Sequence, residues 1–271
     1  MLTDISLGQY YPGNSFIHKL DPRTKILSSL VYIIAVFLAA ESISYAAVIG
    51  FLFVVIAFSR LPFVLVLKSI KPLWIIILLT LWIHVFTGQG EVLWSWKYLI
   101  ITKDGLAMGI KMSLRLILLL MISSILTFTT SPIVLTDGIE AILKPFKRIG
   151  VPAHELAMMM TIALRFIPTL LEETDRIMKA QTARGADFAS GNIVRRAKNM
   201  LPILVPLFIS AFRRADELAV AMEARCYRGG EGRTRMHELA YQQRDMMAAA
   251  SMAGLIVLMI ILKWGGFLCA I

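Results

Sequence analysis

Charged residues are scarce in this sequence. They make up 17% of the 271 residues, compared with about 25% in an ordinary soluble domain. Hydrophobic residues make up 58%, and the mean hydropathy is +0.72. These proportions are typical of an integral membrane protein. The net charge of +10 then requires no nucleic-acid partner, because the cytoplasmic loops of membrane proteins are enriched in Lys and Arg.

Cysteine, histidine and the motifs of catalysis are also rare or absent. Cys226 and Cys269 lie far apart in the sequence, which argues against a disulfide framework. The four histidines never come within metal-ligand spacing of one another. The sequence contains no phosphate-binding loop of the pattern GxxxxGK followed by Ser or Thr, no catalytic carboxylate pair and no nucleophile elbow. We therefore expect no enzymatic activity, and no metal or cofactor bound directly by this chain.

Long apolar runs, in contrast, are abundant. Five of them cover residues 26–40, 43–58, 73–87, 116–128 and 246–262. A helix needs about 20 residues to span a bilayer, so the shorter runs must include flanking residues. The third span then begins near Pro62 and the fourth near Gly105. The predicted fold class is an all-α integral membrane protein, with transmembrane helices 1–4 in residues 1–130 and helix 5 in residues 246–271.

Basic residues are distributed unevenly around these spans. Of the 28 Lys and Arg residues, 17 lie between positions 131 and 245, whereas the segment 88–104 carries only Lys97 and Lys103. Lys and Arg favour the cytoplasmic side of a membrane. We therefore predict that the N-terminus lies inside the cell and the C-terminus outside.

Residues 131–245 form a polar region with two apolar patches, at 156–171 and 201–212. Twelve helical residues reach only about 18 Å, less than the roughly 30 Å of a hydrocarbon core. The longer patch contains Arg165, whose insertion would cost about 2.5–3.5 kcal/mol. We interpret both patches as the N-terminal halves of long helices that lie along or under the inner membrane face and pack on the spans. A membrane hairpin is the alternative interpretation.

Two short stretches of this polar region resemble each other. "AQTARGADF" at 180–188 and "AMEARCYRGG" at 221–230 each place an arginine between two small residues near the end of a helix-forming run. The first tip is Ala183, Arg184 and Gly185, and the second is Ala224, Arg225 and Cys226. Arginine near a helix C-terminus is already favourable with the helix dipole. The small neighbours would also allow a partner surface to approach closely, so we favour docking.

Superposing Arg184 on Arg225 reveals a charge exchange earlier in the two helices. Glu172 and Glu173 take the places of Arg213 and Arg214, and Asp175 takes the place of Asp216. If the helices cross, the acidic pair and the basic pair are expected to meet. Elsewhere, Lys111 and Arg115 share one helix face near the outer end of the fourth span. They are either functional or reach out to the interface, and the sequence does not decide between these roles.

Four stretches of the chain resemble the transmembrane T subunit of energy-coupling-factor (ECF) transporters, the ATP-driven importers of vitamins and trace metals. The last two of these stretches, which include the two tips, are the most specific. They are "GQYYPGNSFIHKLDPRTK" at 8–25, "TFTTSPIVLTDGIEAILKPFKRIGVP" at 127–152, "ALRFIPTLLEETDRIMKAQTARGADF" at 163–188 and "LPILVPLFISAFRRADELAVAMEARCYRGGEGRTR" at 201–235.

The resemblance implies a non-catalytic scaffold in a bacterial plasma membrane. Its coupling helices would dock through the two tips onto two cytoplasmic ATPases, which bind ATP and magnesium. They would transmit motion to a small substrate-binding membrane subunit. The second tip departs from the family's Ala-Arg-Gly pattern because it ends in Cys226, which puts a glycine-only backbone conformation in doubt there. The alternative function is a self-sufficient permease with its own substrate path.

Overall fold

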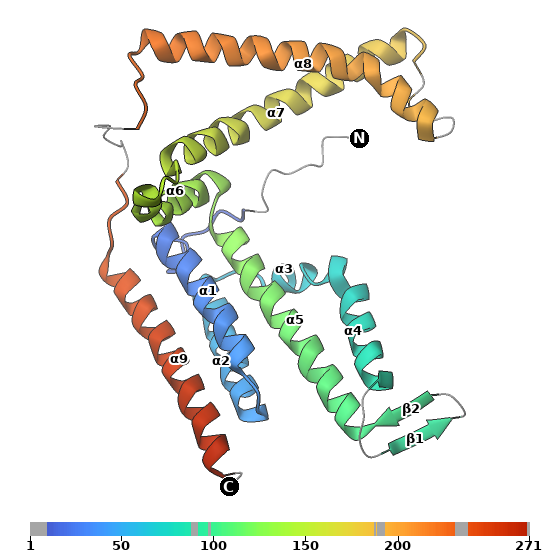
Figure 1. Ribbon diagram of the computed structural model, residues 1–271, viewed down its shortest axis with the longest axis vertical. Coiled ribbons are helices and arrows are strands. Elements are labelled where there is room, and N and C mark those ends of the chain that lie inside the picture. The colour runs from blue at the N-terminus through green and yellow to red at the C-terminus, as the bar shows by residue number, and fades with distance from the viewer. Residues whose placement is uncertain are drawn as a thin grey trace. The chain divides into compact units, whose positions relative to one another are not determined.

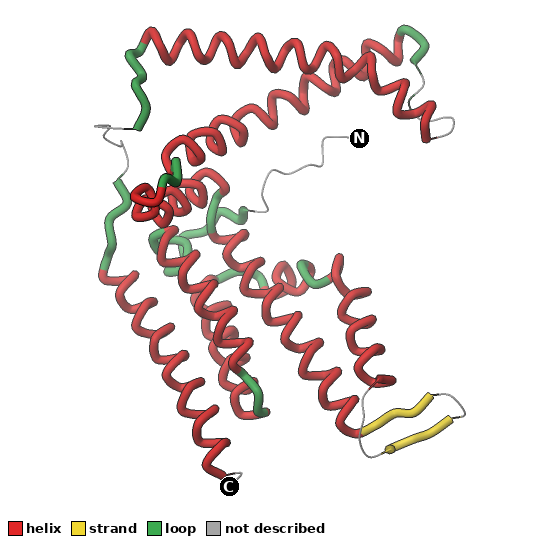
Figure 2. The backbone as a smooth tube through the Cα atoms, in the orientation of Figure 1, coloured by secondary structure: helices red, strands yellow, loops and turns green. Residues whose placement is uncertain are grey.

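The computed structural model describes residues 10–87, 92–96, 99–186, 188, 193–230 and 238–269 of the chain. It divides into two compact units. We call Gly8–Gly138 together with Leu239–Ile271 the bundle unit, and Ile139–Glu238 the arm unit. Figure 2 shows that helices dominate both units. The predicted all-α membrane class is therefore confirmed.

Four long helices of the bundle unit run side by side (Figure 1). They are α1 (Pro22–Leu38), α2 (Ser42–Ser59), α5 (Lys103–Thr129) and α9 (Gln243–Cys269). Between α2 and α5 the chain forms α3 (Phe63–Lys68), the 3-10 helix η1 (Lys71–Leu73) and α4 (Trp74–Thr87), and α4 packs against α5. Helix α6 (Pro132–Leu143) follows α5. The boundary between the two units falls inside this helix, after Gly138.

The core of the bundle unit is apolar and is contributed by all four long helices. Its fully buried members include Tyr32, Val48, Leu118 and Met259. The Tyr32 hydroxyl donates a hydrogen bond of 3.2 Å to the carbonyl of Val48, so the polar end of this buried ring is satisfied. Burial of these side chains between helices fixes the mutual positions of α1, α2, α5 and α9.

Local sequence signals explain where the helices begin. Asp21 caps α1 by accepting a 2.9 Å hydrogen bond from the backbone N–H of Arg23, and Pro22 occupies the first turn, where its missing N–H costs nothing. Thr102 caps α5 in the same manner, through the N–H of Gly105. At the C-terminal end of α2, Arg60 adopts a left-handed conformation with φ of 53°. These boundaries are therefore encoded locally.

A small β-hairpin interrupts the helical pattern. Strands β1 (Val92–Trp96) and β2 (Leu99–Thr102) pair antiparallel within the segment 88–104, which separates the predicted third and fourth spans. This addition leaves the fold class unchanged, because the hairpin is short and lies between two helices.

Five helices are long and apolar enough to cross a membrane: Ser42–Ser59, Phe63–Thr87, Lys103–Thr129, Ala153–Ala183 and Gln243–Trp264. Four of them coincide with predicted spans, and the third begins next to Pro62 as expected. The predicted first span forms α1, whose 17 residues extend about 25 Å. The fifth helix of sufficient length and composition is instead Ala153–Ala183, which the sequence assigned to the cytoplasmic region. The predicted boundaries at 130/131 and 245/246 stay predictions.

The arm unit consists of the 3-10 helix η2 (Lys144–Ile149) and two very long helices, α7 (Ala153–Ala183) and α8 (Ile193–Ala224). The two helices cross, and their C-terminal ends lie at opposite ends of the pair (Figure 1). Little of their surface is covered within the chain. Ala153, Ala157 and Ile203 are buried, whereas Phe208 and Phe212 are exposed. The arm unit thus presents apolar side chains that its own fold does not bury.

Candidate functional site: the ends of two long helices

The first tip ends α7 in a hydrogen-bonded turn. The N–H of Gly185 donates to the carbonyl of Thr182 (3.0 Å), and the N–H of Ala186 donates to the carbonyl of Gln181 (3.0 Å). Gly185 adopts φ of +87°. This pair of bonds, closed by a left-handed residue, is the Schellman motif. It places Arg184 at the last position before the chain reverses.

The second tip ends α8 in the same turn. The N–H of Cys226 donates to the carbonyl of Glu223 (2.8 Å), and the N–H of Tyr227 donates to the carbonyl of Met222 (3.0 Å). Cys226 has φ of +57° and occupies the position that Gly185 holds in the first tip. Cysteine therefore adopts the left-handed conformation that the sequence alone put in doubt, at a cost of about 1–2 kcal/mol relative to glycine.

Both arginines point their charge into open surroundings. All six tip residues are exposed: Ala183, Arg184, Gly185, Ala224, Arg225 and Cys226. Among the residues that the structure describes, neither the Arg184 nor the Arg225 guanidinium has a hydrogen-bond or ion-pair partner. A guanidinium carries five N–H donors in a rigid fork. Each tip therefore presents the N–H donors of an exposed guanidinium at the end of a long helix.

The crossing of α7 and α8 brings one predicted charge pair together. Arg214 donates from Nη2 to Oε2 of Glu173 at 2.9 Å, and both side chains are partly exposed. Asp175 instead pairs within α7, with Lys179.

The other charges predicted at the crossing have no described ion pair across it. Glu172, Arg213 and Asp216 are exposed, and within the described residues no ion pair joins them to the opposite helix. Among the described residues, the ion pair across the crossing is thus the partly exposed Glu173–Arg214 pair, and a pair of this kind is worth about 0.2–1 kcal/mol.

A second contact joins the chain that follows the second tip to the beginning of α7. His154 donates from Nδ1 to Oε1 of Glu140 at 3.1 Å. A Cβ atom on Gly230 would lie 2.5 Å from the His154 ring. Only glycine permits this approach. The segment that follows the second tip therefore packs directly on the His154 imidazole, in the first turn of α7.

Lys111 and Arg115 act on the end of a neighbouring helix in the bundle unit. Lys111 Nζ donates to the carbonyl of Ala40 at 3.2 Å, and Arg115 Nη2 donates to the carbonyl of Ala39 at 3.3 Å. The Arg115 guanidinium also lies 5.3 Å from the centre of the Phe37 ring. The two cations therefore cap the C-terminal end of α1, where helix carbonyls lack internal partners.

A buried carboxylate that sequence analysis missed ties two helix starts together. Asp245 accepts the N–H of Asp21 through Oδ1 and the N–H of Gln242 through Oδ2, both at 2.8 Å. The first bond fastens α1, and the second is one of the two bonds of a capping box, from the third residue of α9 back to its cap. Lys25, which is also buried, donates to the carbonyls of His18 and Thr129, both at 3.0 Å. We call Asp21, Lys25 and Asp245 the helix-start cluster. The sequence signal that could have revealed the contact at the start of α9 was the spacing of Gln242 and Asp245.

His18 is a packing residue that organises the segment before α1. Its Nε2 donates to the carbonyl of Tyr11 at 3.0 Å, and its Nδ1 accepts from the Ser15 hydroxyl at 2.6 Å. Burial, followed by the nearby charge of Lys25, lowers the pKa of His18 below its ordinary value. The neutral imidazole is therefore the form that this segment holds.

No metal centre is evident in the part of the chain that the structure describes. Within it, His, Cys, Asp and Glu form no group of three or more that could hold an ion. The described candidate site thus consists of two helix ends with exposed arginines, next to exposed apolar surface.

Comparison with known proteins supplies the family. A family model described as CbiQ, cobalt transport protein, matches residues 13–237. Three similar proteins are each named energy-coupling factor transporter transmembrane protein EcfT. That of Acidaminococcus fermentans is 70% identical over 98% of this chain and 99% of its own length. That of Clostridium kluyveri is 55% identical over 98% and 100%, and that of Bacillus subtilis is 46% identical over 97% and 100%. The chain is therefore a multi-pass membrane protein that belongs to the CbiQ family, together with the EcfT transmembrane subunits of energy-coupling factor transporters.

Proposed function

We propose that this chain is the scaffold that couples two cytoplasmic ATPases to a small substrate-binding membrane subunit in an ATP-driven importer of vitamins or other micronutrients. The observation that carries the proposal is the pair of identical helix ends, each with an exposed arginine that has no partner among the described residues. Two equivalent tips suit two equivalent receiving grooves. The name of the relatives, energy-coupling factor transporter transmembrane protein, supports an assembly of several subunits.

The chemistry of the tips fits a groove on a folded partner. An arginine fork matches carboxylates, or the carbonyls at the end of a partner helix. The small residues on both sides of each arginine let the partner backbone approach. Docking a helix end into a groove is a common recognition mode. A force applied at either tip would act on a long continuous helix, since α7 and α8 contain 31 and 32 residues, with Pro168 inside α7 and Pro202 and Pro206 inside α8.

ATP hydrolysis is assigned to the partners in this proposal. The sequence has no GxxxxGK loop, which is the usual cradle for nucleotide phosphates. ATP and magnesium would therefore bind to the ATPase subunits, and this chain would be non-catalytic. Substrate choice would belong to the small membrane subunit.

The orientation follows from the basic residues. With the N-terminus inside the cell and the C-terminus outside, residues 131–245 lie in the cytoplasm with 17 of the 28 Lys and Arg residues, in agreement with the positive-inside rule. Helix α7 is long enough to span a membrane, but it carries Arg165, Arg176 and Lys179 together with three acidic residues of its C-terminal half. We therefore place α7 beneath the membrane.

The test uses charge reversal at the tips in the assembled transporter. Arg184→Glu and Arg225→Glu should each weaken ATPase retention and ATP-driven uptake, and the double variant should abolish both. Disrupting a buried, hydrogen-bonded charge pair at an interface costs about 2–5 kcal/mol. Arg148→Glu, at an exposed position of the arm unit, is the matched control and should leave both unchanged. Wild-type uptake by the double variant would refute docking through the tips.

Co-purification separates the scaffold from the permease alternative. A scaffold should be isolated with two ATPases and a small membrane protein, and it should be inactive in liposomes without them. Substrate uptake by this chain alone in proteoliposomes would overturn the proposal.

A further inference from the structure

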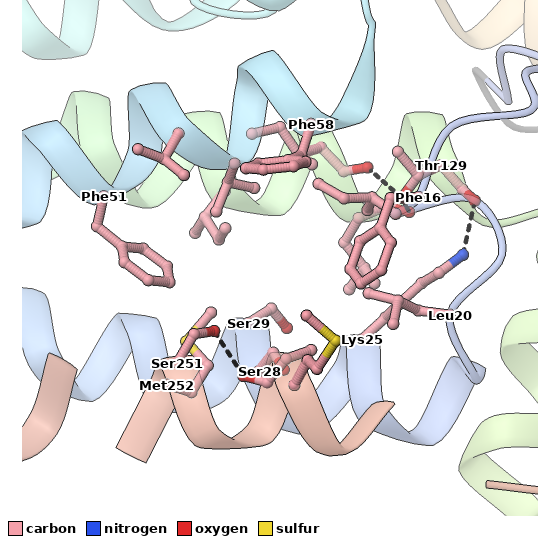
Figure 3. A pocket seen from close by; sticks show the side chains of 18 residues that line it. Phe16, Leu20, Lys25, Ser28, Ser29, Phe51, Phe58, Thr129, Ser251 and Met252 are labelled. Atoms are coloured by element: carbon pink, nitrogen blue, oxygen red, sulfur yellow. Dashed lines mark hydrogen bonds between the residues drawn. The ribbon is translucent and has the colours of Figure 1, made fainter. Parts of the chain in front are cut away.

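The bundle unit contains a cavity of about 290 Å³ between its long helices (Figure 3). Its floor is Ile122, Ile125 and Thr129 of α5, and one wall is Phe51, Val55 and Phe58 of α2. The opposite wall comes from α1 and α9. The side chains of Phe16 and Leu20, from the segment before α1, line one end.

Of the five polar side chains that line the cavity, all but Ser28 have hydrogen-bond partners among the described residues. Ser29 donates to the carbonyl of Ile26, and Ser251 donates to the carbonyl of Ala248, each at 2.8 Å. The Thr129 hydroxyl donates to the carbonyl of Ile125 at 2.8 Å, and Lys25 donates to two carbonyls. Apart from the Ser28 hydroxyl, the free surface of the cavity is therefore that of aliphatic and aromatic side chains.

The mouth of the cavity faces the medium beside α2 and α9. Val54 and Phe58 on α2 are 51% and 60% exposed, and Met247 on α9 is 65% exposed. Both helices are long and apolar enough to span a membrane. The medium in front of a membrane-spanning helix is lipid hydrocarbon, so the cavity opens sideways into acyl chains and not into water.

The size of the cavity favours a narrow occupant. Along α2 it extends from Phe51 to Phe58, which is about 10 Å at the helical rise. A single acyl chain is much narrower than a helix, whose diameter is about 10 Å, and its apolar surface matches the lining of the cavity. The slot follows the helix axes, which is the direction in which lipid tails run.

We propose that one acyl chain of a membrane phospholipid occupies this cavity, between α2 and α9. The chain would fill apolar space that the side chains leave open, and it would pack against Ile122 and Ile125 on the floor. The proposal requires only that the bundle unit lies in a bilayer, and it is independent of ATPase docking.

The test is photolabelling by a lipid tail. The full chain is placed in nanodiscs of phosphatidylglycerol and phosphatidylethanolamine that contain a phospholipid with a diazirine in one acyl chain. After irradiation, mass spectrometry should find adducts concentrated on Phe51, Phe58 and Met252. Exposed apolar residues of α4, such as Ile75 and Leu79, should be labelled much less. Equal labelling of the two sets would overturn the proposal.

Ser251→Phe fills the mouth of the slot and should remove most of the labelling at Phe51 and Phe58. Ala253→Phe, at an exposed position outside the cavity lining, should leave the labelling unchanged. Ala248→Leu is a second filling variant, for use if the phenylalanine variant does not fold. Unchanged labelling in a folded filling variant would refute the site. Loss of labelling when the whole transporter is assembled would show that a partner side chain occupies the slot, and this would also refute the proposal.

Discussion

The bundle unit and the arm unit differ in whether their charged side chains at helix ends are buried and bonded or exposed. In the bundle unit, buried Lys25 and Asp245 bond to backbone groups at the ends of other helices. In the arm unit, Arg184 and Arg225 stand exposed at helix ends, with no partner among the described residues. The difference teaches that charged side chains bond to the protein's own backbone in one unit and are exposed at helix ends in the other. Variants in the two units should therefore fail differently.

The largest effect on stability is expected from the helix-start cluster. Asp245→Ala removes the acceptor of two backbone N–H groups, those of Asp21 and Gln242. Each orphaned donor costs about 1–3 kcal/mol where it is buried. The melting temperature of the purified chain in detergent should fall clearly. Asp216→Ala, at an exposed position in the arm unit, should change stability by no more than about 0.5 kcal/mol. Equal effects would remove the contrast between the units.

Two glycines of the bundle unit should respond to alanine with opposite signs. A Cβ on Gly138 in α6 would lie 2.9 Å from the Pro22 Cβ, whereas a Cβ on Gly254 in α9 meets nothing within 4 Å. Gly138→Ala should destabilise the chain by about 1–3 kcal/mol through overpacking. Gly254→Ala should stabilise it by up to about 1 kcal/mol through helix propensity. Thermal unfolding of the two variants side by side gives both signs, and a stabilised Gly138→Ala variant would contradict the close approach of α6 to α1.

The two tips should also respond oppositely to an exchange of their third residue. Cys226→Gly relieves the left-handed strain and should slow hydrogen exchange of the Tyr227 amide. Gly185→Cys introduces that strain, about 1–2 kcal/mol, and should speed exchange of the Ala186 amide. A Cβ on Gly185 would meet no atom within 4 Å, so backbone strain alone is tested. Similar exchange rates in the two variants and the wild type would contradict the shared turn.

The smallest stability effect is expected at the helix crossing. Glu173→Arg or Arg214→Glu breaks a partly exposed pair worth about 0.2–1 kcal/mol, so the melting temperature should barely change. ATP-driven uptake by the assembled transporter should fall in each single variant and recover in the double reversal. Without recovery in the double variant, the ion pair would have no part in coupling.

Sequence reasoning located the features that depend on local patterns. Hydropathy placed four spans, because each apolar run continues for most of a membrane-crossing helix. The two tips were found because Arg184 and Arg225 share their small neighbours. The left-handed Cys226 was not predicted, since cysteine disfavours that conformation and only the surrounding turn imposes it. The link from Asp245 to Asp21 joins positions 224 residues apart, and no local pattern contains such a pairing. The pairing of β1 (Val92–Trp96) with β2 (Leu99–Thr102) was missed because a short apolar segment does not distinguish strand from loop.

The close packing of Gly230 on His154 has a mechanical consequence. Gly230, in the segment that follows α8, packs on His154 at the beginning of α7. A movement of the second tip at Arg225 would therefore act on the beginning of α7 as well as on α8. Under the proposed docking of two ATPases at the two tips, this contact would link the movements of the two ATPases through the scaffold.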